Sequence, residues 1–120
     1  MNRVYTDYIQ DVLDSIKEIE EFVSDEKYEI FVKDRKTINA VIRSLEVIGE
    51  AVKNLPKDIK VRYPNIPWSK MSGMRDKIIH EYFGVDLEIV WQTIKQDLPK
   101  VRPLIEKVLK NYKSNLQLQK

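Results

Sequence analysis

The stretch from residue 34 to residue 56, DRKTINAVIRSLEVIGEAVKNLP, decides the fold that the rest of the sequence has to fit. Its apolar residues recur at spacings of three and four positions, which places them along one side of an α-helix. These residues are Ile38, Val41, Ile42, Leu45, Ile48, Val52 and Leu55. Asp34 is a favourable N-cap, and Pro56 ends the helix because proline has no backbone N–H to donate. A helix with one apolar side needs other helices to cover it.

The same apolar spacing predicts further helices before and after this one. A first long helix is expected over about residues 3–24, and a short helical turn over residues 28–32. Three prolines between residues 56 and 67 indicate a connection with at most one helical turn, at residues 57–62. A third long helix is expected from Pro67–Trp68 to Phe83–Gly84, because proline suits the first helical position and glycine suits the C-terminal cap.

Asp86 is a suitable N-cap for a fourth helix, and Pro99 is expected to interrupt the chain before a fifth helical run over residues 104–109. No alternating strand pattern, hairpin turn or internal repeat is present in the sequence. The sequence therefore predicts an all-α fold, an up-down bundle of four to five helices. A chain of 120 residues fits one domain, expected over residues 1–113, with a polar C-terminal tail over residues 114–120.

The composition excludes several kinds of site. The chain has no cysteine, which excludes a disulfide framework, a thiolate zinc site and a cysteine nucleophile. It has one histidine, which excludes a multi-histidine metal site, and we expect neither a metal nor a cofactor. No apolar signal core follows Met1, and no apolar run approaches the roughly 18 residues that a membrane span needs. A cytoplasmic protein without a membrane segment is expected.

The net charge is only +2, but the charges are unevenly distributed. Residues 1–34 contain 4 Lys and Arg against 10 Asp and Glu, residues 35–82 contain 10 against 5, and residues 83–120 contain 7 against 4. A locally positive surface in the middle of the chain favours a polyanion such as RNA. The acidic first segment either forms a solvated helix face or docks against a basic protein partner.

The third long helix carries an arginine in an unusual place. With residues spaced about 100° apart around the helix, Arg75 lies in the middle of the apolar arc rather than at its rim. The residues within roughly 60° of it are Trp68, Met71, Ile78, Ile79 and Tyr82. Three interpretations stay open: the arginine extends along its neighbours to water, forms a buried ion pair with Glu46 or Glu50, or acts at a cleft or subunit contact.

Asp76 and His80 lie four positions apart and therefore on the same flank of this helix. A carboxylate beside an imidazole fixes its tautomer and raises its pKa, which suits His80 for general acid or base catalysis. Arg75 suits the binding of a phosphate. RNA cleavage needs these two functions, because the 2′-hydroxyl serves as the internal nucleophile. A hydrogen-bonded structural histidine is the alternative.

Gly73 and Tyr82 are two further candidates on the same helix. Gly73 lies seven positions before His80, and a glycine inside a helix costs about 1 kcal/mol relative to alanine. It allows either the close approach of substrate or of a second subunit, or tight packing within the monomer. Tyr82 lies on the Arg75 side in the last turn, where it either places its hydroxyl in the same cleft or is an ordinary tyrosine at the edge of the core.

The pattern Arg75-x4-His80-x-Tyr82 resembles the R-x4-H-x-Y motif of HepT-like toxins, a family within the wider HEPN group. The resemblance extends over about residues 3–110. Beside the motif it rests on flanking features, namely Pro67-Trp68, Gly73-Met74-Arg75-Asp76, His80-Glu81-Tyr82-Phe83-Gly84-Val85-Asp86, Val90-Trp91, Leu98-Pro99, Arg43 and Ile48-Gly49-Glu50-Ala51.

The resemblance implies a fold, a site and a partner. The fold is an all-α bundle that forms a homodimer and brings two motifs into one cleft, with Arg75 and His80 as the catalytic pair. The residue after the arginine is often asparagine in this group, and Asp76 is an acidic variant that either orients His80 or binds substrate. The partner is a minimal nucleotidyltransferase antitoxin, which transfers AMP from ATP to the motif tyrosine, here Tyr82.

Two functional hypotheses follow. The first is the toxin of a type VII-like toxin–antitoxin system, a metal-independent endoribonuclease that cleaves RNA as a homodimer, with Gly73 and Asp76 in supporting roles. The second is a non-catalytic helical partner or nucleotide-binding module that regulates a nucleotidyltransferase, which accounts equally well for the acidic first helix. A helix-turn-helix DNA-binding protein is disfavoured, because no short helix pair with a clustered basic face is present.

Overall fold

The computed structural model describes the backbone of residues 4–80 and 86–118, and all side chains in these ranges except those of residues 75, 77–80 and 116–118. Four long helices form the body of the fold. They are α1 (Tyr5–Phe22), α3 (Arg35–Lys53), α5 (Trp68–His80) and α7 (Leu98–Leu118). No strand occurs in the described ranges, and the predicted all-α fold is confirmed.

Three short helices and one π-helical turn connect the long helices. They are α2 (Tyr28–Phe31), α4 (Lys57–Arg62), α6 (Leu87–Gln92) and the π-helical turn η2 (Thr93–Asp97). The short turns predicted over residues 28–32 and 57–62 are therefore present. The helix predicted over residues 67–84 is present as far as His80, and its expected end at Phe83–Gly84 lies outside the described residues.

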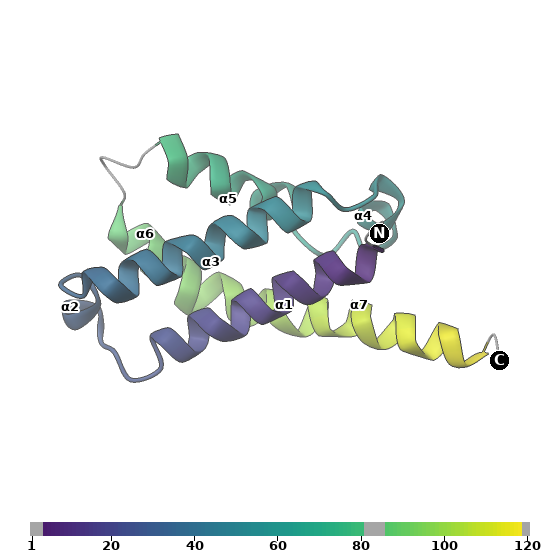
Figure 1. Ribbon diagram of the computed structural model, residues 1–120, viewed down its shortest axis with the longest axis horizontal. Helices are drawn as coiled ribbons and strands as arrows, with labels where there is room; N and C mark the ends of the chain where they lie inside the picture. Colours follow the sequence, from purple (N-terminus) through teal and green to yellow (C-terminus); the bar gives the residue numbers. More distant parts are fainter. Residues whose placement is uncertain (1–3, 81–85, 119–120) are drawn as a thin grey trace.

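The central element of the bundle is α3. The helix α1 runs antiparallel to α3 on one side, α5 packs against α3 on the other, and α7 lies along α1 (Figure 1). The short helix α6 and η2 lead directly into α7. The stretch that decides the fold, residues 34–56, thus forms the helix that supplies packing surfaces for two neighbours, which agrees with the predicted helical bundle.

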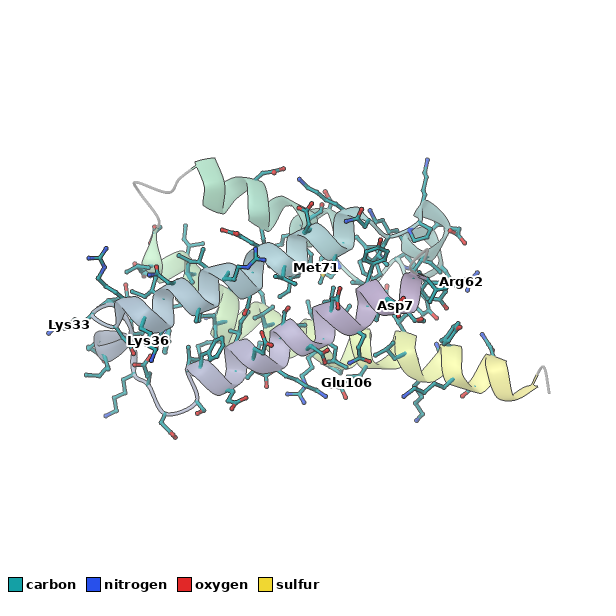
Figure 2. All side chains as sticks on the ribbon, in the orientation of Figure 1. Asp7, Lys33, Lys36, Arg62, Met71 and Glu106 are labelled. Carbon is teal, nitrogen blue, oxygen red and sulfur yellow. The ribbon has the colours of Figure 1, made fainter. Side chains whose placement is uncertain are left out.

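The core consists of the apolar sides of the four long helices, with additions from α2 and η2. Its members with at most 2% of their surface exposed are Ile9, Val12, Ile16, Ile19, Val23, Phe31, Val41, Leu45, Ile48, Val52, Met71, Ile94, Leu98, Ile105 and Val108. Charged side chains such as Lys33, Arg62 and Glu106 are exposed on the outside of the bundle (Figure 2). Within the described ranges, no helix is both long and apolar enough to cross a membrane.

Both aspartates predicted as N-caps occupy that position. The Asp34 carboxylate accepts hydrogen bonds from the Thr37 hydroxyl at 2.6 Å and from its backbone N–H at 3.1 Å. These hydrogen bonds hold the pKa of Asp34 below its usual range. The Asp86 carboxylate accepts from the backbone N–H groups of Glu88 at 3.0 Å and Ile89 at 3.3 Å. The helices α3 and α6 therefore begin where the sequence predicts.

The predicted interruption at Pro99 is wrong, because the chain stays helical from Leu87 to Leu118. Pro99 is the second residue of α7, and the π-helical turn η2 directly precedes this helix. A proline ring clashes with the carbonyl four residues before it in a regular α-helix. In a π-helical turn the backbone hydrogen bonds join residues five positions apart instead of four. The carbonyl that would clash with the proline ring is thereby displaced, and the helix continues. The final helix also extends into residues 114–118 of the predicted polar tail.

Candidate active site

The candidate site lies on α5, whose first turn is fixed in the bundle. Trp68 is 7% exposed, and its indole Nε1–H donates a hydrogen bond to the backbone carbonyl of Tyr63 at 3.0 Å. Met71, labelled in Figure 2, is 1% exposed and belongs to the core. Its backbone N–H donates to the carbonyl of Pro67 at 3.0 Å. The start of α5 is therefore held by side-chain burial and by hydrogen bonds to the preceding loop.

The motif positions 75 to 80 continue this helix without a break. Arg75, Asp76 and His80 consequently lie on one helix, as the apolar spacing predicts. The side chains of Arg75 and His80 lie outside the described part of the structure, and Tyr82 lies outside the described residues altogether. The contact between Asp76 and His80 and the role of Tyr82 therefore remain predictions.

Gly73 lies two positions before Arg75, and the space beside it is open. Apart from the helix's own nearby backbone and the two adjacent residues, a Cβ atom built on this glycine meets no atom of the described residues within 4 Å. Tight packing within the monomer, one of the two sequence interpretations, is therefore not observed against the described residues. The other interpretation, close approach of a substrate or a second subunit, stays a prediction.

Asp76 is linked to the central helix by an ion pair that sequence reasoning missed. The ammonium Nζ of Lys53, the last residue of α3, lies 3.0 Å from Oδ1 and 3.2 Å from Oδ2 of Asp76. The two residues are 23 positions apart in sequence, and no local spacing rule reaches that far. The sequence offered only one indication that Lys53 has a defined place. It is a basic residue in the last turn of α3, where a positive charge interacts favourably with the helix dipole.

The two glutamates predicted as possible partners of Arg75 both occur on α3. Glu46 is half-buried and lies 3.7 Å from Arg43, measured between Oε2 and the guanidinium Nη1. Glu50 is exposed. Whether either also contacts Arg75 stays a prediction, since the arginine side chain lies outside the described part.

The surroundings of α5 contain one further feature. A cavity of about 250 Å³ lies between the start of α5, η2 and α7. Its lining is mainly apolar and includes Met71, Met74 and Leu98. At its rim, Lys70 Nζ lies 3.5 Å from Oδ2 of Asp97. Among the side chains described, no group of three His, Cys, Asp or Glu residues is arranged to hold a metal ion.

The fold and the charged positions of α5 define a class of protein, a small helical bundle whose candidate site lies on one helix. Residues 12–108 match the family described as ribonuclease HepT-like. This match spans most of the chain and includes all of α5. The chain therefore belongs to the HepT-like ribonuclease family, as the motif resemblance predicts.

Individual relatives agree with this assignment. The chain is 49% identical over 110 residues to the probable ribonuclease HepT of Thermococcus cleftensis, which covers 92% of this chain and 100% of the relative. It is 47% identical over 104 residues to a protein of Methanocaldococcus jannaschii named as a candidate RNase, covering 87% and 86%. A candidate RNase of Caldanaerobacter subterraneus is 42% identical over 106 residues, covering 88% and 95%. No solved structure matches at a significant level.

The open space beside Gly73 leads to a stability prediction. Replacing Gly73 with alanine is expected to raise the free energy of unfolding by about 0.5–1 kcal/mol, because alanine loses less backbone entropy in a helix. Chemical denaturation of the two proteins measures the difference. A loss of stability in the variant, measured at concentrations where both proteins are monomeric, would contradict the open space described beside this position.

Proposed function

We propose that this protein is a metal-independent endoribonuclease and the toxin of a toxin–antitoxin pair, with Arg75 and His80 as its catalytic residues. The observation that carries the proposal is the match to the HepT-like ribonuclease family over residues 12–108, which contains the complete R-x4-H pattern. The continuous helix across positions 75 to 80 supports it, because the pattern then has a fixed geometry.

The chemistry that these two residues can supply is sufficient for RNA cleavage. Neutral His80 accepts the proton of a ribose 2′-hydroxyl, and the 2′-oxygen attacks the adjacent phosphorus. The bond from phosphorus to the 5′-oxygen breaks, and solvent protonates the leaving oxygen. Arg75 offsets the additional negative charge on the phosphoryl oxygens during this step. The products are a 2′,3′-cyclic phosphate and a 5′-hydroxyl end, and His80 returns its proton to solvent.

We also propose that the active form is a homodimer. Positions 75 and 80 are five residues apart, which corresponds to about 140° around an α-helix, so one helix directs the two side chains apart. The open space beside Gly73 gives a second copy room to approach the same helix closely. The Asp76 side chain is 54% exposed, so this part of α5 is accessible from outside the monomer. A second motif brought to this position supplies the missing half of the site.

The catalytic assignment is tested by replacing each member of the pair. Arg75→Ala and His80→Ala are each expected to reduce the rate of RNA cleavage by at least about 100-fold, since a positioned proton-transfer group or charge donor contributes that much. Cleavage of a fluorescent RNA by the purified proteins measures the effect. Lys70→Ala is the matched control, because it removes an exposed cation from the same helix.

If both variants cleave RNA as fast as the unaltered protein, the catalytic assignment is wrong. If no form of the protein cleaves RNA but it copurifies with a nucleotidyltransferase, the non-catalytic partner module is the better description. The acidic outer side of α1, which suits a basic protein partner, is the feature that favours this second function.

We further propose that a minimal nucleotidyltransferase antitoxin neutralises the protein by transferring AMP from ATP to the Tyr82 hydroxyl. The tyrosine oxygen attacks the α-phosphorus of ATP, pyrophosphate leaves, and the hydroxyl proton is lost to solvent or a base. The added phosphodiester carries a negative charge and considerable bulk. Both would oppose the binding of an RNA phosphate by the neighbouring motif.

The modification proposal is tested by intact-mass measurement after coexpression with an adjacent nucleotidyltransferase. One or more AMP-sized additions are expected on the unaltered protein, and none on Tyr82→Phe. The Tyr63→Phe variant serves as the control, because this half-buried tyrosine lies on the loop before α5. Modification that persists in Tyr82→Phe would contradict the assignment of the acceptor, while leaving the ribonuclease assignment unaffected.

A further inference from the structure

We propose that Lys53 is a positioning residue for the site on α5. Its ammonium holds the carboxylate of Asp76 and thereby fixes the rotation of α5 against α3 at the turn that carries Arg75. The inference rests on the proposed ribonuclease function for its kinetic consequence, but its structural consequence is measurable without activity.

The geometry of the contact supports a positioning role. Lys53 Nζ lies 3.0 Å and 3.2 Å from the two carboxylate oxygens of Asp76. The ammonium therefore donates to both oxygens of the carboxylate and not to one of them alone. Lys53 is the last residue of α3, and its backbone is fixed by the helix that forms the centre of the bundle. A shared contact from a fixed helix restricts how far the third turn of α5 can rotate.

The location of the contact along α5 explains why it matters. The first turn of α5 is held by the buried side chains of Trp68 and Met71. Asp76 lies five residues beyond Met71, which corresponds to about 7.5 Å along the helix axis. It is directly adjacent to Arg75 and four positions before His80. Met74, directly before Arg75, also packs against the core. The ion pair adds a polar contact to α3 one position beyond the motif arginine.

The exposure of the pair indicates that its main contribution is not to folding stability. The side chains of Lys53 and Asp76 are 37% and 54% exposed. Ion pairs in contact with solvent contribute little to stability, because water screens them and two flexible side chains lose freedom. Breaking the pair should leave the bundle folded, while it releases the turn beside Arg75.

The charge of Lys53 has a second consequence for a polyanionic substrate. An uncompensated carboxylate next to Arg75 would repel the phosphate that the arginine is proposed to bind, and would compete for its guanidinium. The Lys53 ammonium offsets this negative charge at a distance of 3.0 Å. Lys53 therefore reduces the repulsion between the acidic residue at position 76 and an RNA phosphate.

The chain offers a matched control pair on the same helix. Lys70 Nζ lies 3.5 Å from Oδ2 of Asp97 in η2, with side-chain exposures of 66% and 36%. This ion pair also joins α5 to a neighbouring element and also faces solvent. Positions 70 and 76 differ by six residues, so the two pairs lie about 120° apart around the helix. Removing Lys70 breaks a comparable surface contact away from the motif.

The kinetic test compares the full-length variants Lys53→Met, Lys53→Arg, Asp76→Asn and Lys70→Met in single-turnover RNA cleavage. Lys53→Met is expected to lower the rate by about twofold to fivefold, because a solvent-exposed contact biases the orientation of the helix only modestly. Lys53→Arg keeps the charge and the contact, so it should restore most of the rate. Lys70→Met should cleave at the unaltered rate. The double variant Lys53→Met with Asp76→Asn should be no worse than the poorer single variant, since both remove one interaction.

A second readout does not depend on activity, because His80 is the only histidine in the chain. The imidazole proton resonances in the NMR spectrum therefore report on this one side chain. At fixed pH they should shift in Lys53→Met, stay near their original positions in Lys53→Arg and be unaffected in Lys70→Met. The thermal unfolding midpoint of each variant shows that it is folded.

The two readouts separate the inference from the proposed function. If Arg75→Ala abolishes cleavage while folded Lys53→Met retains the full rate and unchanged imidazole resonances, Lys53 has no positioning role and the ribonuclease assignment stands. If the unaltered protein does not cleave RNA, the proposed function is wrong, and the resonances alone decide whether Lys53 positions the motif. An equal effect of Lys70→Met in either readout would also overturn the inference.

Discussion

The packing of α5 against α3 is the contact on which the rest of the candidate site depends. The central helix α3 uses its apolar residues to bury α1 on one side, and α5 covers the other side. Buried Trp68 and Met71 fix the beginning of α5, and the Lys53–Asp76 ion pair links the two helices again near the motif. Half-buried Met74 packs against the core between these two contacts, so the helix is attached to the bundle from its first turn to the motif arginine.

These attachments leave part of α5 uncovered. The space beside Gly73 is open, and Asp76 is exposed although it is paired with Lys53. A helix that is fixed by its neighbours but open beside its polar residues suits the approach of a large, charged ligand or of another copy of the chain. No described side chain lies against Gly73, so packing among the described residues does not account for a glycine at this point.

Much of the fold could be predicted from the sequence, since the spacing of apolar residues and the two aspartate caps are local features. Asp34 and Asp86 begin helices where their side chains satisfy free backbone N–H groups. Pro99 shows the limit of a local rule, because a preceding π-helical turn removes the clash that would otherwise break the helix.

The site was predictable to a smaller extent. The order of Arg75, Asp76 and His80 on one helix followed from spacing, whereas their chemical roles came from resemblance to a known family. The Lys53–Asp76 pair could not be predicted, because it joins residues 23 positions apart and depends on how two helices are aligned in space. The sequence likewise could not distinguish the two interpretations of Gly73, and the open space beside it among the described residues became visible only in the structure.

The central claim is that one copy of α5 carries an incomplete site, which a second copy completes. The most direct test measures RNA cleavage per chain across a dilution series, with the dimer fraction determined by analytical ultracentrifugation in the same buffer. The account predicts that activity per chain rises and falls in proportion to the dimer fraction. Undiminished activity per chain at concentrations where the protein is fully monomeric would contradict it.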